Sequence, residues 1–197
     1  QFIEQYSGFG NVYNIYNKDN QFEKCELRNA SELTDNVLRS LTLDFPNFSS
    51  LDLANTNITD KGINYLAETL KTRLMYINLK GCKKLGNQSL LALAFNCPSL
   101  QFLGMFNHAT TEDLVTLVKE FGGELVFIDL SNCLHVTPAI ISKIKNKQFI
   151  DLSNIAIDKA TFDTECLTKL GKNNPGLMGF YFSCDAAFEG GLRHVKD

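Results

Sequence analysis

Phe127-Ile128-Asp129-Leu130-Ser131-Asn132 recurs unchanged as Phe149-Ile150-Asp151-Leu152-Ser153-Asn154. Extending this register in both directions gives a pattern with apolar residues at positions one, four and six, and a Cys-like or Asn-like residue at position nine. The pattern begins at Phe22, Phe48, Leu74, Leu100 and Leu125, and more loosely at Lys147 and Leu177. Successive starts are 26, 26, 26, 25, 22 and 30 residues apart, and such regular spacing predicts about seven structural repeats.

Each repeat is predicted to begin with a short strand and to continue as a helix. Apolar residues at positions four and six, such as Ile77 and Leu79, face the same side of a strand. The hydrophobic period then changes to about 3.6 residues, which predicts a helix with one apolar stripe. Residues suited to helix N-termini precede these stripes, at Thr34-Asp35, Thr59-Asp60, Thr110-Thr111, Thr137-Pro138 and Asp158.

A repeat of one strand and one helix buries its apolar face only against neighbouring repeats. The sequence therefore predicts an α/β fold, a solenoid (horseshoe) with a parallel β-sheet on its concave face and helices on its convex face. Residues 22–197 are assigned to the repeats, and residues 1–21, which do not fit the register, to an N-terminal cap. Within this cap, Val12–Tyr16 is predicted to pair with the edge strand Phe22–Leu27. At the other end, Gly191-Leu192 begins a further helical pattern, so the array is expected to continue or to end in an incomplete cap.

Several segments carry a family resemblance. Leu74-x-x-Ile77-x-Leu79-x-x-Cys82 and Leu125-x-x-Ile128-x-Leu130-x-x-Cys133 share one pattern, and Asn96-Cys97-Pro98-x-Leu100 leads into the next strand. Over residues 22–192 the chain resembles the cysteine-containing subfamily of leucine-rich repeat proteins, the class found in the substrate-receptor half of F-box proteins and related adaptors. The resemblance implies a leucine-rich-repeat fold and a protein-binding role. His108 and Asp185 depart from the pattern at position nine, and the repeats from Lys147 and Leu177 depart in length, so local irregularity is expected there.

The six cysteines favour buried, reduced thiols over a disulfide framework. Cys82 and Cys133 hold equivalent positions two repeats apart, where strands about 4.8 Å apart place the Cα atoms ~10 Å from each other, beyond disulfide reach. Reduced thiols indicate an intracellular, reducing compartment, the cytoplasm first and an organelle as the alternative. A competing signal is four triplets that match the N-glycosylation pattern, beginning at Asn29, Asn47, Asn57 and Asn87.

The composition and the motifs exclude several classes of function. A net charge of -3 argues against sequence-independent nucleic-acid binding, and no apolar run approaches the roughly 20 residues of a membrane-spanning helix. The sequence contains no phosphate-binding glycine loop, nucleophile elbow or metal-binding motif, and His108, His135 and His194 are scattered. We therefore expect no catalysis, no cofactor, no bound metal and no membrane insertion, and we expect a protein as the partner.

Function is expected on the concave face, at strand positions whose side chains point away from the core. Position three carries four consecutive aromatic residues, Tyr76, Phe102, Phe127 and Phe149. Phe106 at position seven and Tyr181 at position five are expected to add two rings, and position five also carries Asp52, Asp129 and Asp151. Four half-exposed rings amount to roughly 300–500 Å² of apolar surface, which usually contacts a partner. The alternatives are that another segment covers the rings, that the acids form only a solvated face, and that the Asn residues at position eight only satisfy strand ends.

Three hypotheses for function follow. The first is a non-catalytic scaffold or adaptor whose concave surface binds a protein, with Asp52, Asp129 and Asp151 attracting basic groups beside an apolar anchor. The second, implied by the resemblance alone, is a substrate-recognition subunit of a cullin-type ubiquitin ligase. The third is a structural subunit of a larger complex that permanently covers the aromatic face or the ends of the solenoid.

Overall fold

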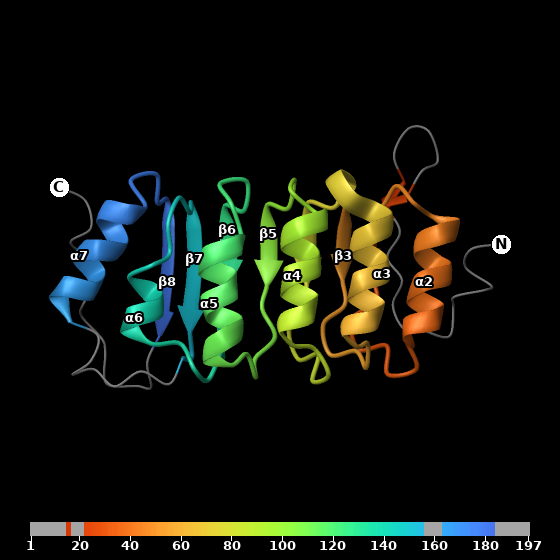
Figure 1. Cartoon of the computed structure of the whole chain (residues 1–197), viewed down its shortest axis with the longest axis horizontal. Helices are drawn as coiled ribbons and strands as arrows, with labels where there is room; N and C mark the ends of the chain where they lie inside the picture. The colour runs from red at the N-terminus through yellow and green to blue at the C-terminus, as the bar shows by residue number, and fades with distance from the viewer. Residues whose placement is uncertain (1–14, 17–21, 156–162, 184–197) are drawn as a thin grey trace.

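The computed structural model describes residues 15–16, 22–155 and 163–183. Its strands form one sheet in which each strand lies beside the next in sequence (Figure 1). They are β1 (Ile15–Tyr16), β2 (Phe22–Glu26), β3 (Ser50–Asp52), β4 (Tyr76–Asn78), β5 (Phe102–Gly104), β6 (Phe127–Asp129), β7 (Phe149–Ser153) and β8 (Gly179–Ser183). Strands β2 to β8 are parallel, because the chain after each strand crosses back to the same end of the sheet.

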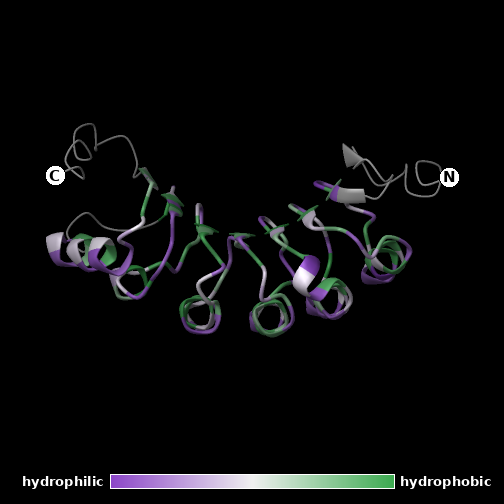
Figure 2. Ribbon diagram, turned by 90° about the horizontal axis from the view of Figure 1, so that it is seen from above, coloured by the Kyte–Doolittle hydropathy of each residue, from purple (hydrophilic) through white to green (hydrophobic). Residues whose placement is uncertain are grey.

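Each crossover from β2 to β8 contains a helix. The helices are α2 (Asp35–Asp44), α3 (Asp60–Leu70) with the 3-10 turn η2 (Lys71–Arg73), α4 (Asn87–Asn96), α5 (Thr111–Glu120), α6 (Pro138–Ile141) and α7 (Thr164–Asn173). Figure 2 shows the sheet on the inner side of a curved array and the helices on its outer side. Packed helices need 8–10 Å where strands need about 4.8 Å, so the stack curves toward the sheet. The predicted α/β solenoid with a concave parallel sheet is confirmed.

The register of the sheet is the one that the sequence predicts. Position three forms a continuous row of paired Cα atoms, Lys24, Ser50, Tyr76, Phe102, Phe127, Phe149 and Gly179. The next position along each strand is buried, and Leu51, Ile77 and Leu103 are 0% exposed. Because side chains alternate along a strand, the row at position three faces away from the core.

The helix starts confirm the predicted caps where the structure describes them. Thr34, Thr59, Thr110 and Thr137 each accept a backbone N–H in the first turn of their helix. Each cap satisfies a donor that the first turn of a helix leaves without an intrahelical partner. The predicted cap Asp158 lies outside the described residues, and α7 begins at Thr164 with Asp163 as its cap.

The N-terminal edge of the parallel sheet is covered by a short antiparallel strand. Ile15 and Tyr16 of β1 pair with Lys24 and Phe22 of β2. This is the edge pairing predicted for Val12–Tyr16, of which residues 12–14 lie outside the described part. The helical pattern predicted from Gly191 lies outside it as well. The pairing gives partners to backbone groups that an edge strand leaves open.

Asparagine recurs at position eight because the backbone there is left-handed. Asn29, Asn55, Asn132 and Asn154 have φ between 57° and 63°, and Gly81 has φ 70°. Asn adopts this conformation more readily than most residues, and Gly does so without strain. The amide of Asn55 also donates to Asn29 Oδ1 at 2.9 Å, so this position links successive repeats.

The cysteines pack between repeats. Five lie in the described part of the chain, and all five are buried free thiols, as predicted. The Sγ of Cys82 donates to the carbonyl of Leu53 in the preceding repeat at 3.0 Å. Burial raises the pKa to about 12 in three of them, Cys25, Cys97 and Cys133. These thiols stay protonated at neutral pH and serve as small apolar groups in the core.

The prediction that Phe106 points outward is wrong. Phe106 is 0% exposed, and so is Met105 beside it. The N–H of Ala109 donates to the carbonyl of Phe106 at 3.2 Å. In the preceding repeat the N–H of Cys82 makes the same bond to Leu79, also at 3.2 Å. The chain therefore carries one extra residue between β5 and this turn, a bulge that turns Phe106 into the core beside Met105, the residue aligned with Leu79.

The fifth repeat, which starts at Leu125, is irregular, as its 22-residue length predicts. Helix α6 has 4 residues, whereas α5 and α7 have 10 each. Lys147 begins the next repeat and is only 4% exposed. The equivalent residues Phe48, Leu74 and Leu100 are apolar and at most 2% exposed. A lysine thus occupies a core position where the helical layer is thinnest.

Candidate functional site

Four rings form a continuous row on the concave face, which we call the aromatic column: Tyr76, Phe102, Phe127 and Phe149. Tyr76 and Phe102 stack with their centroids 4.1 Å apart. Phe102 meets Phe127 edge to face at 4.7 Å, and Phe127 lies 5.6 Å from Phe149. All four side chains are half-buried. The column is therefore one connected apolar strip across β4 to β7, with ring geometries that favour attraction.

The column ends at Gly179 on β8, which has no side chain to continue it. The ring of Phe149 covers this glycine, since a Cβ on Gly179 would lie 2.6 Å from Phe149 Cδ1. Tyr181, two residues further along β8, is 53% exposed. The structure thus holds Phe149 against the sheet and leaves Tyr181 as the most exposed of the rings predicted to bind a partner.

Tyr76 gives the column one polar end. Burial, and then the nearby carboxylate of Asp52, raise the pKa of Tyr76 to about 12. The phenol therefore remains protonated at neutral pH. Its hydroxyl is a hydrogen-bond donor at the edge of an apolar strip.

The acids at position five bind the main chain of their own strand ends. Oδ1 of Asp52 accepts the N–H of Ala54 at 3.0 Å. Asp129 and Asp151 accept the N–H two residues further on at 3.0 and 2.8 Å. Such Asx turns give a partner to an N–H where the strand ends. Each acid therefore supports the fold with one of its oxygens.

Cations from other repeats pair with two of these acids. Arg28 Nη2 lies 2.5 Å from Asp52 Oδ2, and the Asp52 side chain is 6% exposed. Lys80 Nζ lies 2.5 Å from Asp129 Oδ2 and 2.5 Å from Ser131 Oγ. Asp52 and Asp129 are therefore already neutralised, which the sequence did not predict.

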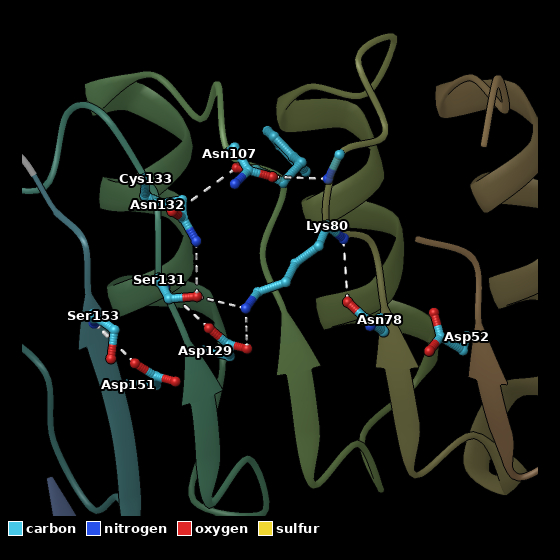
Figure 3. Close-up of polar contacts among 12 residues, drawn as sticks. Asp52, Asn78, Lys80, Asn107, Asp129, Ser131, Asn132, Cys133, Asp151 and Ser153 are labelled. Atoms are coloured by element: carbon cyan, nitrogen blue, oxygen red, sulfur yellow. Dashed lines mark hydrogen bonds and ion pairs between the residues drawn. The ribbon is translucent and has the colours of Figure 1, made fainter. Parts of the chain in front are cut away.

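Lys80 reaches its partners by crossing a whole strand. Figure 3 shows its side chain extending from the end of β4 over β5 to Asp129 and Ser131. Position five of β5 is Gly104, which places no side chain in the path. We call Lys80, Asp129 and Ser131 the lysine bridge. It forms a fixed polar border along the carboxyl-end side of the aromatic column.

Asp151 differs from the other two acids. It is half-buried and lies on the same face of β7 as Phe149, two residues further along. Within the described residues no cation lies within ion-pair distance of its carboxylate. Of the three acids predicted to attract basic groups, Asp151 is the one without an ion pair to a described residue.

The histidines take structural or exposed places. His108 Nε2 lies 2.8 Å from the carbonyl oxygen of Leu85, and the ring is half-buried, as predicted for a satisfied turn residue. The bulge after β5 puts Ala109, rather than His108, at the buried ninth position. His135 is exposed, and His194 and Cys184 lie outside the described residues.

No cluster of three His, Cys, Asp or Glu side chains among the described residues could hold a metal ion. None of the helices described is both long enough and apolar enough to cross a membrane.

The architecture matches solved leucine-rich-repeat structures. No protein-family model matches the chain. Internalin C2 from Listeria monocytogenes is 16% identical with a TM-score of 0.51, and the match covers 84% of this chain and 75% of internalin C2. The leucine-rich repeat-containing protein LegL7 from Legionella pneumophila is 14% identical with a TM-score of 0.54, over 82% of this chain and 55% of LegL7. The chain thus has a leucine-rich-repeat fold and spans little more than half the length of LegL7.

Sequence reasoning missed three residues that matter for the surface and the interior. Lys80 and Ser131 of the lysine bridge lie at position seven of their repeats, and the available signal was Gly104 at position five of the intervening strand. Lys147 was recognised only as a loose repeat start. The signal there was a basic residue at a position that is otherwise Leu or Phe.

Proposed function

We propose that this chain is a non-catalytic protein-binding module that holds a segment of its partner against the aromatic column. The observation that carries the proposal is the unbroken contact of four half-buried rings across β4 to β7. Rings fixed against one another offer apolar area at low entropic cost, and aromatic anchors dominate the centres of protein interfaces.

The dimensions of the column suit a short peptide segment. Three strand spacings of about 4.8 Å make it about 14 Å long, which matches four or five residues of extended chain. Tyr76 supplies a donor at one end. Asp151, beside Phe149 at the other end, supplies a negative charge for an Arg or Lys of the partner.

The test compares the same substitution on the two faces of the solenoid. Phe102→Ser, Phe127→Ser and Phe149→Ser, combined in one chain, are expected to abolish capture of the specific partner from the native source, measured by quantitative mass spectrometry. Phe95→Ser is the matched control, because Phe95 is 72% exposed on α4 of the convex layer. Circular dichroism verifies that each variant is folded. Undiminished capture by the folded triple variant would overturn the proposal.

Two narrower roles stay predictions. A substrate receptor of a cullin-type ubiquitin ligase rests on the resemblance to the cysteine-containing subfamily, and the absence of cullin-complex subunits from the captured material would contradict it. A structural subunit requires that the column or the ends of the solenoid be covered permanently, and the column is the surface that substitution can test. In that case the isolated chain is expected to self-associate, and the triple Ser variant to be monomeric by light scattering.

A further inference from the structure

A cavity of about 170 Å³ lies between the helices and the sheet, beside the short fifth repeat. Its apolar wall comes from α5, β6 and the segments that follow α5 and α6: Leu117, Val118, Phe121, Ile128 and Ile144. The exposed residues Gly122, Gly123, Lys145 and Asn146 line the side that opens to solvent. The cavity exists because α6 has only 4 residues, so fewer side chains fill the space next to α5. It is on the opposite side of the sheet from the aromatic column.

Lys147 brings an amine to this apolar cavity. The residue lines the cavity and is 4% exposed. Its Nζ donates to the carbonyl of Gly122 at 3.3 Å. Within the described part of the chain this is its one hydrogen bond, whereas an ammonium has three N–H donors. At least two donors are therefore left without a protein acceptor there.

The charge around this amine is not balanced by an acid. Lys145 is the other titratable side chain that lines the cavity, and none of the lining residues is acidic. The charged residues at the end of α5, just after it and near the end of α7 are all exposed, namely Lys119, Glu120, Glu124 and Lys172. Gly122 follows the C-terminal end of α5, whose partial negative charge favours a cation but does not neutralise it.

A purely structural role explains these features poorly. At the same place in other repeats, Leu100 and Leu125 fill the core and are 2% exposed. A lysine that only packs its methylene groups usually extends its amine to water. Burial lowers the pKa of Lys147 to about 8, so at neutral pH most molecules still hold a desolvated ammonium. A cavity with an apolar wall and a buried cation together point to a ligand that supplies both an apolar body and a negative charge.

We propose that this cavity binds a small organic anion, a carboxylate with an apolar body about the size of one six-membered ring, whose charge pairs with Lys147. The volume supports this size, because an apolar cavity of about 150 Å³ is large enough to hold benzene. The apolar walls accept the body of the ligand. The two remaining N–H groups of Lys147 are available for a carboxylate, which forms strong charge-assisted hydrogen bonds with an ammonium.

Benzoate and benzyl alcohol are matched probes, because they share a ring and differ in charge. We expect saturable binding of benzoate to the whole chain, measured by the change in the amide chemical shifts around Ile128 and Gly122. Benzyl alcohol should bind at least about tenfold more weakly. Lys147→Met should weaken benzoate binding about tenfold or more and leave benzyl alcohol binding unchanged. Lys143→Met, an exposed lysine outside the lining, should behave like the wild type. Three results would overturn the proposal: no saturable binding of benzoate, equal affinities for the two probes, or undiminished benzoate binding by Lys147→Met.

The wild-type chain provides a second test that needs no variant. Because the carboxylate pairs with the ammonium form, benzoate affinity should fall as the pH rises through about 8, whereas benzyl alcohol affinity should not change. In the same titration, saturating benzoate should raise the pKa of Lys147, followed by the chemical shift of its Nζ. A benzoate affinity that stays constant across this range rules out Lys147 as its counter-ion. Neither result depends on the aromatic column, so the two proposals fail separately.

Discussion

Replacing Lys147 by Met should stabilise the fold at neutral pH, and the gain should disappear as the pH rises. Burial lowers the pKa of Lys147 from 10.5 to about 8 in the folded chain. Between these two values the unfolded chain therefore binds more protons than the folded chain, and the stability of the wild type rises with pH. A pKa difference of this size corresponds to about 3 kcal/mol.

The sign of the effect follows from which state holds the proton. Below about pH 8 the folded wild type keeps a charged amine in the core. Its free energy of unfolding is then lower by about 3 kcal/mol than it would be with a fully solvated lysine. Met has a similar length and no charge, so Lys147→Met avoids this loss. For a chain of this size the gain corresponds to a melting temperature higher by about 6–12 °C at pH 7. Above about pH 10.5 both chains carry a neutral side chain there, and the difference should approach zero.

Urea unfolding followed by circular dichroism, from pH 7 to about pH 10.5, measures this difference directly. Comparing wild type with variant at each pH cancels the titration of all other groups. Lys143→Met removes an exposed lysine from the same segment and should show no pH-dependent difference. A gain that is the same at every pH, or a loss of stability at pH 7, would refute the reasoning, because either result means that the Lys147 ammonium is well solvated or well paired in the fold.

Three further predictions concern the concave face and the core. Phe127→Ala should lower the free energy of unfolding in urea by about 2–3 kcal/mol, since about half of a ring of 150–250 Å² is buried at ~25 cal/mol per Å², while Phe95→Ala should change it little. A double-mutant cycle of Lys80→Met and Asp129→Asn should give a coupling energy of about 1 kcal/mol. In a Gly104→Ala background this coupling should vanish, because the new Cβ would overlap the Asn78 side chain beneath the path of Lys80. A coupling that persists in that background would show that Gly104 is not needed. Iodoacetamide at pH 8 should modify the buried cysteines only after unfolding, as measured by mass spectrometry, and rapid labelling of the native chain would contradict the burial of Cys25, Cys97 and Cys133.

The sequence predicts the sheet register because burial alternates along a strand. A core residue such as Ile77 fixes the outward direction of Tyr76, and the repeat spacing then places Phe102, Phe127 and Phe149 in the same row. The bulge after β5 could not be predicted in this way. Met105 and Phe106 are both apolar, so either can serve as the inward residue, and both are buried. The number of residues between repeat starts does not show where within a repeat an extra residue lies.

The charge state of the surface depended on contacts that the register does not encode. Position five correctly places Asp52, Asp129 and Asp151 on the concave face. Whether each acid is free depends on long side chains that reach across one or two strands. Arg28 spans one repeat and Lys80 spans two, and the second contact also needs the gap at Gly104. Such contacts join residues 24 and 49 positions apart, and they follow from geometry that only the folded sheet supplies.

If the aromatic column binds a peptide as proposed, its two ends should determine the direction in which that peptide lies. The rings from Phe102 to Phe149 offer apolar area that any hydrophobic segment can use, so they contribute affinity more than selectivity. Tyr76 offers a donor at one end, and Asp151 offers a negative charge at the other end, three strands away. The lysine bridge ties up the charge of Asp129 between them. A partner bound in the opposite direction would place its basic residue at the Tyr76 end, away from an available acid, and would leave Asp151 without a cation. The apolar contacts with the rings are similar in both directions, so this loss of charge pairing lowers the affinity of the reversed peptide. The polarity of the site therefore comes from neutralising Asp52 and Asp129 inside the sheet as much as from leaving Asp151 available.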